Sequence, residues 1–510
     1  QQVWRAAPGE DPRPLTPPTD GRVRWARFVI DAGRRAVFCL REDQSDPELE
    51  PVNSLVRLDL DGENEDLGTV LVAGKERPVA ERASAGGQHS APEMDAAGDA
   101  SSQDEDADLR AGGAAYQSGP DFILDPVLSP DGRRIAWLQW DHPHMSWHET
   151  VLWVGELDDA GDLRSADPVA GGAGESLEQP EWLDDDTLLV LSDRTGFSNL
   201  YRLDVTAPER GLVAITEGEL DLGQPRWVPG TRSYALLPDG SVVSCRTQLG
   251  FRQLIVVDTT TGAVRELPCG VPYRGEPTVI DQERVAHGVL QEDQPHTVWE
   301  VELATGNARP VVGAFVPFDR ELAVRPEPVS WTSTDGATAH GFLYRPKNPH
   351  VTAPEGDLPP LIVTLHGGPT AAATPGFSAE RTFWTSRGFA VLDVNYGGST
   401  GFGRAYRERL DGRWGEVDVQ DATSGAAYLA EQGIVDGDRL LITGGSAGGF
   451  TTLAAATFTD VFAAGASHFG VSDLAALATG THKLESRYLD GLVAPWPQGA
   501  EVYAERSPIH

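Results

Sequence analysis

Hydrophobic and polar residues follow two different patterns along the chain, and the pattern changes near residue 320. Before that point, short apolar runs with a period of two alternate with clusters of Gly, Pro, Asp and Asn. Such runs predict β-strands, and the clusters predict the turns between them. Later, near-continuous apolar runs alternate with helical stretches. We therefore expect two domains, residues 1–320 and 321–510, joined by a linker at 317–328.

The first domain contains a repeated unit. Each copy begins with Pro-x-Trp or Ser-Pro-Asp-Gly, continues through two apolar strands separated by a polar turn, and closes on an acidic residue. The closing acids Asp158, Asp204, Asp258 and Glu302 are 46, 54 and 44 residues apart. A period of about 40–50 residues carrying four short strands is typical of a β-propeller blade. Five copies are recognisable and the first residues resemble the tail of a sixth, so we expect an incomplete N-terminal β-propeller that begins before residue 1.

An acidic segment interrupts the second copy at residues 82–118. Its core, EMDAAGDASSQDEDAD, contains seven acids and no basic residue. A segment of this composition cannot bury enough apolar surface to order itself. We interpret it as a solvated low-complexity insertion.

The second domain has the pattern of a parallel sheet buried on both faces. Helical stretches at 418–433 and 447–458 lie between the apolar runs, and this alternation predicts a doubly wound α/β domain. The predicted strands are GFLYRP, LIVTLHGG, FAVLDVNYGG, LLITGGS and AAGASHFG.

Composition narrows the classes of partner and compartment. The net charge of −36 argues against nucleic acid and anionic membrane surfaces as partners. No apolar run reaches the roughly 20 residues that span a bilayer. The widely spaced Cys39, Cys245 and Cys269 match neither a zinc site nor a disulfide framework. We expect a cytoplasmic protein.

One cluster of possible metal ligands lies in WDHPHMSWHE, residues 140–149, which holds three histidines and two acids. Its spacing fits no standard zinc pattern, and its proline and tryptophans suit a loop between strands. GGSTGFG, residues 397–403, lacks the lysine of a phosphate-binding loop. We expect no metal and no cofactor.

The strongest chemical signal is Gly444-Gly445-Ser446-Ala447-Gly448, which matches Gly-x-Ser-x-Gly with a strand before it and a helix after it. The sharp strand-to-helix turn requires neighbours without bulky side chains. The helix N-terminus would also aim the Ala447 N–H at a developing oxyanion. This pattern predicts that Ser446 is a nucleophile.

LHGGP, Leu365–Pro369, supplies a second part of such a site. A His-Gly-Gly loop after an early strand provides the other oxyanion donor in α/β-hydrolases, and we assign this role to the N–H of Gly368, with Gly367 close by. His366 precedes the serine, whereas the hydrolase order is serine, acid, histidine. We interpret His366 as a residue that shapes the loop.

These motifs resemble the prolyl oligopeptidase family of serine peptidases, in its bacterial dipeptidyl/acylaminoacyl peptidase branch. The resemblance extends over nearly the whole chain apart from the acidic insertion. It implies a propeller that covers an α/β-hydrolase and admits only peptides or unfolded segments. It also implies Ser446 as nucleophile, Ala447 and Gly368 as oxyanion donors, and Tyr396 with His366 at the substrate pocket. The segments that carry it include HGGPT, NYGGSTGFG, GGSAGGF and SDRTGFSNLYRLD.

The resemblance further implies an aspartate and a histidine that follow the serine. Asp473 and His468 follow Ser446 in the reverse order, and neither His482 nor His510 has an acid at a suitable spacing. We therefore expect the triad Asp and His to lie beyond His510. The chain then reads as a fragment of a longer peptidase, truncated at both ends, whose hydrolase sheet is incomplete at its C-terminus.

The leading functional hypothesis is a serine oligopeptidase that cleaves short peptides through an acyl-enzyme on Ser446, with the propeller gating access. A carboxylesterase or acyl hydrolase using the same serine is one alternative. An inactive, propeller-based peptide-binding protein is the other. Peptides are the expected partners, a homo-oligomer is compatible with the sequence, and no motif sets the cleavage-site preference or the choice between exo- and endopeptidase action.

Overall fold

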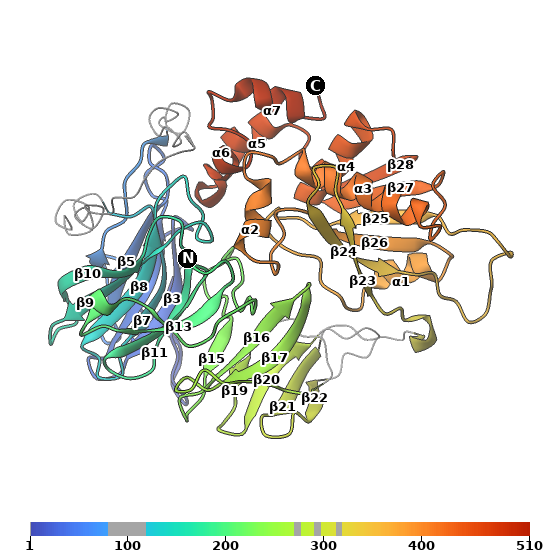
Figure 1. The fold of residues 1–510 in the computed structure, drawn as a ribbon. Helices are drawn as coiled ribbons and strands as arrows, with labels where there is room; N and C mark the ends of the chain where they lie inside the picture. Colours follow the sequence, from blue (N-terminus) through green and yellow to red (C-terminus); the bar gives the residue numbers. More distant parts are fainter. Residues whose placement is uncertain (1, 80–118, 270–276, 290–296, 313–318) are drawn as a thin grey trace, which may run out of the picture.

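The computed structural model describes residues 2–79, 119–269, 277–289, 297–312 and 319–510. The predicted acidic insertion at 82–118 lies outside the described residues. The chain has two halves, which Figure 1 shows side by side. We call residues 2–312 the blade half and residues 319–510 the α/β half.

Five four-stranded antiparallel sheets make up most of the blade half, and the strands of each sheet are consecutive in the chain. This confirms the four-stranded repeat predicted from the sequence. A two-stranded ladder of β1 (Trp4–Arg5) and β2 (Arg13–Pro14) precedes them. The sheets are β3 (Val23–Asp31), β4 (Ala36–Asp43), β5 (Val52–Asp59), β6 (Thr69–Val72); β7 (Phe122–Leu128), β8 (Arg134–Trp140), β9 (Val151–Leu157), β10 (Leu163–Gly171); β11 (Leu177–Trp182), β12 (Thr187–Ser192), β13 (Asn199–Asp204), β14 (Val213–Ala214); β15 (Tyr234–Leu236), β16 (Val242–Gln248), β17 (Phe251–Val257), β18 (Val264–Glu266); and β19 (Thr278–Val279), β20 (Arg284–Val289), β21 (Thr297–Glu302), β22 (Ala308–Val312).

The closing acids of the repeat lie where the third strand of a sheet turns into the fourth. The Oδ1 atoms of Asp158, Asp204 and Asp258 each accept the backbone N–H two residues further on, at 2.8–2.9 Å. A short carboxylate satisfies the turn backbone in this way, which is why aspartate recurs there. At Glu302 the longer side chain accepts the hydroxyl of Thr305 instead.

The α/β half is built on one six-stranded sheet of order β23-β24-β26-β25-β27-β28. The four strands from β26 to β28 are parallel, as predicted. The strand predicted at GFLYRP lies mostly in β24, which is antiparallel to both of its neighbours. A short turn joins it to β23 and accounts for that pairing. The strand predicted at AAGASHFG is not buried on both faces: β28 is mostly exposed, because it lies at the edge of the described sheet. The strands are β23 (Glu327–Thr332), β24 (Thr338–Tyr344), β25 (Leu361–Leu365), β26 (Ala390–Asn395), β27 (Leu440–Gly445) and β28 (Ala464–His468).

Two long helices cover this sheet, and both were predicted from the sequence. α3 (Val417–Glu431) and α4 (Ala447–Phe458) pack in the same buried core as the parallel strands. Within the described residues, no helix is both long and apolar enough to span a membrane. The shorter helices are α1 (Ala379–Thr385), α2 (Arg404–Arg407), α5 (Leu474–Gly480), α6 (Tyr488–Leu492) and α7 (Ala500–Arg506).

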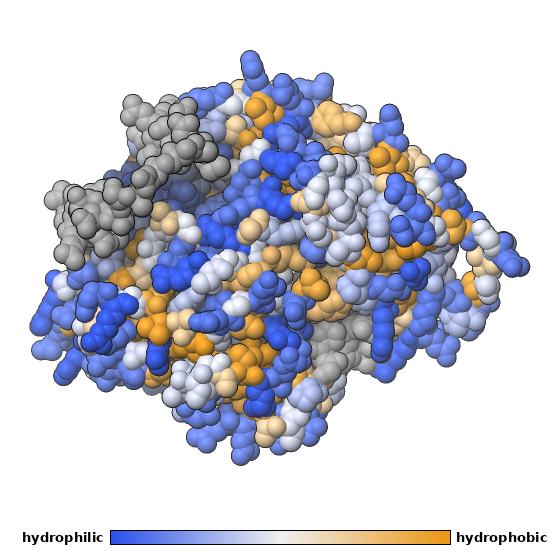
Figure 2. Space-filling model, viewed as in Figure 1, coloured by the Kyte–Doolittle hydropathy of each residue, from blue (hydrophilic) through white to orange (hydrophobic). Residues whose placement is uncertain are grey.

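Polar groups join the two halves where α2 meets the blade half (Figure 1). Arg404 and Arg407 of α2 donate to the buried carboxylate of Asp193, at 3.1 and 2.8 Å. Farther along, the buried Lys483 donates from Nζ to the carbonyl oxygens of Pro51 (2.9 Å) and Asp121 (2.8 Å). The face in Figure 2 is mostly hydrophilic, as expected for a chain with a net charge of −36.

Candidate active site

Ser446 lies at the turn between β27 and α4, in the conformation that the motif predicts. Its φ of 54° and ψ of −119° lie outside the regions that a residue with a side chain usually adopts. Ser446 is exposed, whereas the next residue, Ala447, is buried at the start of α4. The Ser446 N–H donates to the carbonyl of His468 at 3.1 Å. The turn therefore presents the hydroxyl outward while both flanking elements are held in place.

Close backbone packing explains two of the glycines around Ser446. A Cβ on Gly444 would stand 2.5 Å from the carbonyl of Gly448. A Cβ on Gly448 would stand 2.7 Å from the carbonyl oxygen of His366 and would collide with the carbonyl oxygen of Leu365. Glycine at these positions lets the first turn of α4 pack directly on the loop that follows β25.

The His366–Thr370 loop lies beside the serine. A Cβ on Gly367 would be 3.5 Å from the Cβ of Ser446 and 3.3 Å from the carbonyl oxygen of Gly445. Gly368 has a φ of +124°, which favours glycine, and a Cβ there would be 2.8 Å from the Thr370 nitrogen. The structure thus brings together both predicted sources of oxyanion donors, the loop and the start of α4. The donor roles of Gly368 and Ala447 stay predictions.

His366 holds the loop through both ring nitrogens. Its Nδ1 is 2.8 Å from the carbonyl oxygen of Gly367, and because a carbonyl only accepts, we assign the ring proton to Nδ1. Nε2 then accepts the hydroxyl of Ser399, also at 2.8 Å. Burial lowers the pKa of His366 to about 4, against the opposing effect of the bond to Gly367, so the ring is neutral at pH 7. This geometry agrees with the interpretation of His366 as a loop-shaping residue.

Tyr396 supports the same loop from beneath. Its ring stacks on His366 with centroids 4.4 Å apart, and its hydroxyl donates to the carbonyl of His366 at 3.1 Å. The side chain is fully buried. In this structure Tyr396 contacts the His366–Thr370 loop, and its predicted place at the substrate pocket stays a prediction.

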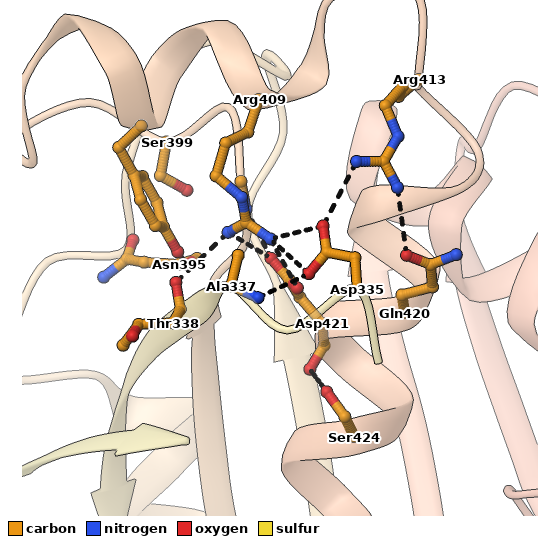
Figure 3. A network of polar contacts seen from close by, with 12 residues as sticks. Asp335, Ala337, Thr338, Asn395, Ser399, Arg409, Arg413, Gln420, Asp421 and Ser424 are labelled. Carbon is orange, nitrogen blue, oxygen red and sulfur yellow. Dashed lines mark hydrogen bonds and ion pairs between the residues drawn. The ribbon is translucent and has the colours of Figure 1, made fainter. Parts of the chain in front are cut away.

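An ion pair between the buried Asp421 and the partly buried Arg409, which the sequence analysis missed, holds the loop that follows Tyr396 (Figure 3). The Asp421 carboxylate on α3 accepts the N–H of Gly397 at 2.7 Å and two bonds from Arg409 at 3.1 and 3.2 Å. Arg409 also lies 3.4 Å from Asp335, in the turn between β23 and β24. Burial raises the pKa of Asp421, and Arg409 and Gly397 oppose that rise. The signal that could have found this pair is a charged residue on the buried face of the predicted helix 418–433.

Asp473 and His482, two of the candidates that follow Ser446, have other partners. Asp473 caps α5 by accepting the N–H groups of Ala475 and Ala476 at 2.9 and 3.1 Å. His482 lies 3.6 Å from Glu485. Over the described part of the chain, no side chain is hydrogen bonded to the Ser446 hydroxyl.

The histidine-rich segment 140–149 lies in the loop between β8 and β9, as its composition suggested. Burial lowers the pKa of both His142 and His148 to about 3. Neither here nor elsewhere among the described residues do three or more His, Cys, Asp or Glu side chains form a group that could hold a metal ion.

Comparison with known proteins places these features in a family. A model of the prolyl oligopeptidase family matches residues 375–510. Dipeptidyl aminopeptidase BIII of Pseudoxanthomonas mexicana is 29% identical over 225 residues, which are 42% of this chain and 33% of that protein. The chain thus matches about a third of the length of this curated relative.

Two solved structures cover far more of the chain. The crystal structure of a puromycin hydrolase aligns with 99% of it at 34% identity and a TM-score of 0.83, and 70% of that protein is covered. A puromycin-hydrolyzing peptidase of Mycobacterium tuberculosis aligns with 100% of it at 34% identity and a TM-score of 0.85, with 72% of that protein covered. With this identity over more than two thirds of each neighbour, the chain belongs to the prolyl oligopeptidase family.

Proposed function

We propose that this protein is a serine peptidase that hydrolyses short peptides and aminoacyl amides through an acyl-enzyme on Ser446. The observation that carries the proposal is the exposed serine in a strained strand-to-helix turn, with the His366–Thr370 loop packed beside it. Family membership and the puromycin-hydrolysing neighbours support the substrate class. The cytoplasmic location expected from the sequence stays a prediction.

In the proposed reaction, the Ser446 hydroxyl attacks the scissile carbonyl carbon and a tetrahedral intermediate forms. Its oxyanion is stabilised by the N–H groups of Ala447 and Gly368, and the α4 N-terminus adds favourable electrostatics. Collapse of the intermediate expels the amine and leaves an ester on Ser446, which water then hydrolyses. The reaction needs a general base and an acid that orients it. We place both outside these 510 residues, as the sequence led us to expect.

We further propose that the five four-stranded sheets belong to a propeller that restricts access to Ser446, with the division between the halves near residue 320. The arginine and lysine contacts between the halves support a blade half that covers the serine side of the α/β half. A large folded substrate would be excluded by such a cover. A carboxylesterase acting on small esters has no need of one, which favours peptides over esters as substrates.

The test compares the full-length protein with its Ser446→Ala variant on aminoacyl and dipeptidyl p-nitroanilides, puromycin and p-nitrophenyl esters. We expect kcat/KM to be higher for the amides than for the esters, and Ser446→Ala to lower hydrolysis by at least about 10⁴-fold. Ser45→Ala, at an exposed serine in the loop between β4 and β5, controls for handling and should match the wild type. Higher kcat/KM for the esters would overturn the peptidase proposal. Peptide binding without turnover, unchanged in Ser446→Ala, would favour a binding protein.

A further inference from the structure

A tryptophan of the blade half reaches the loop beside Ser446. The indole N–H of Trp227, in the segment between β14 and β15, donates to the carbonyl oxygen of Thr370 at 2.8 Å. The two residues are 143 positions apart in the chain. Thr370 ends the His366–Thr370 loop, so this bond joins the blade half directly to the proposed oxyanion loop.

The indole of Trp227 is held by two other aromatic rings. Its centroid lies 4.6 Å from that of Trp147, in the loop between β8 and β9, and 5.7 Å from that of Tyr488 on α6. Tyr488 and Thr370 are also joined, hydroxyl to hydroxyl, at 2.5 Å. Thr370 is therefore fixed through both its carbonyl and its side chain, and it is almost fully buried. The cluster draws on both halves of the molecule, so its geometry depends on their contact.

The remaining bonds of this loop region come from the α/β half itself. The carbonyl of Ala371 accepts the N–H of Thr400, and the N–H of Ala373 donates to Oδ1 of Asn395, both at 2.8 Å. His366 fixes the opposite end of the loop, as described above. Gly367 and Gly368 lie between these two fixed ends, and glycine backbone has no side chain to limit its own rotation. Within the loop, the Gly367 carbonyl is bonded to Nδ1 of His366 and the Pro369 carbonyl accepts the Tyr396 hydroxyl at 3.4 Å, so Thr370 is one of several anchors of this backbone.

We propose that Trp227 is a positioning residue that makes the shape of the oxyanion loop depend on contact with the blade half. This inference rests on the proposed function of Ser446. Trp227 contacts neither the substrate nor the reacting atoms; it acts through the carbonyl of Thr370. When the halves are in contact, the bond from Trp227 helps to hold the loop beside Ser446. When they separate, the loop loses one of its two anchors at Thr370.

The deciding variant is Trp227→Phe in the full-length protein, which keeps a ring in the cluster and removes the N–H donor. The matched control is Trp147→Phe in the same cluster, because the Trp147 indole nitrogen has no hydrogen-bond partner among the described residues. Loss of one hydrogen bond that holds the transition-state geometry should lower kcat by roughly 3- to 10-fold and change KM by less than about twofold. Trp147→Phe should keep kcat within about twofold of the wild-type value. Equal losses in the two variants would overturn the proposal, because they would show that ring packing alone matters.

A second measurement needs no catalysis. Hydrogen–deuterium exchange of a peptide covering residues 366–375 is compared in a Ser446→Ala background, with and without Trp227→Phe. We expect at least about threefold faster exchange with Trp227→Phe and no change with Trp147→Phe. Unchanged exchange with Trp227→Phe would overturn the inference. If instead Ser446→Ala proves to retain activity, the proposed function fails, while the exchange data still decide whether Trp227 holds the loop.

Discussion

Replacing Asp421 with asparagine removes one negative charge from the interior of the α/β half while keeping the shape of the side chain. The wild-type carboxylate is fully buried and accepts three hydrogen bonds, one from Gly397 and two from Arg409. Asparagine offers one carbonyl oxygen and turns an N–H₂ group toward a partner that only donates. Arg409 would then be left with a weaker set of acceptors.

The magnitude follows from the remaining partners of Arg409. Removing one member of a buried ion pair costs about 3–5 kcal/mol when the other charge is left uncompensated. Here Arg409 keeps Asp335 at 3.4 Å and the carbonyl of Thr338 at 3.3 Å. We therefore expect Asp421→Asn to lower the free energy of unfolding by about 2–4 kcal/mol. The matched control, Asp335→Asn, changes a partly exposed carboxylate and should lower the free energy of unfolding by less than about 1 kcal/mol.

The assay is urea unfolding followed by tryptophan fluorescence. Trp331 is a suitable reporter because its indole N–H donates to the backbone carbonyl of Asp421 at 3.2 Å and to the hydroxyl of Ser424 at 3.0 Å. We expect the transition of the α/β half to move to lower urea in Asp421→Asn and to stay near the wild-type position in Asp335→Asn. If both variants unfold within about 0.5 kcal/mol of the wild type, the pair contributes no net stability and the reasoning from burial is wrong.

Two further predictions concern packing and pH. Gly448→Ala should lower the free energy of unfolding by about 1–3 kcal/mol, because its Cβ would collide with the backbone at Leu365. Gly491→Ala is the control, since a Cβ there meets open space, and it should leave the melting temperature unchanged or slightly higher. Equal melting temperatures for the two variants would contradict this packing. Burial holds the folded-state pKa of His148 at about 3, below the value of about 6.5 in an unfolded chain, so the unfolded state binds the proton first as pH falls. The contribution of His148 to the free energy of unfolding is fully present above about pH 6.5, and it decreases toward pH 3 by about 1.4 kcal/mol per pH unit. His148→Asn, whose side-chain oxygen can still accept the N–H of Met145, should reduce that slope of unfolding free energy between pH 4 and 6, and an unchanged slope would contradict the assignment.

Features set by neighbours in the chain could be predicted from the sequence. The closing aspartates correctly predicted where an apolar strand ends in each repeat, because each one binds the backbone only two residues away. The helix predicted at 447–458 begins and ends where α4 does. Its start depends on the Gly-x-Ser-x-Gly turn, whose geometry is local.

Features set by distant partners could not be predicted in the same way. Tyr396 is buried by its contacts with His366, 30 residues earlier, and nothing in its own segment indicates this. Trp227 was recognised only as part of the Pro-x-Trp start of a repeat, because its bond to Thr370 crosses between the two halves. The direction of β24 also depends on pairing, since an apolar run does not tell which way a strand runs.

The contacts of the buried Lys483 can form only late in synthesis, because their partners lie far apart in the chain. Its two acceptors, the carbonyls of Pro51 and Asp121, directly precede β5 and β7, and they lie 432 and 362 residues earlier in the chain. At about 5–20 residues per second, a ribosome needs roughly 20–70 s to reach Lys483 after Asp121 has been made. Throughout that interval the two carbonyls lack the ammonium group that they later accept, and the Phe122 ring lacks the cation that lies 4.9 Å from its centroid in the folded protein. During those seconds the nascent chain lacks a contact that the folded protein has, and chaperones bind nascent chains whose surfaces are incomplete in this way.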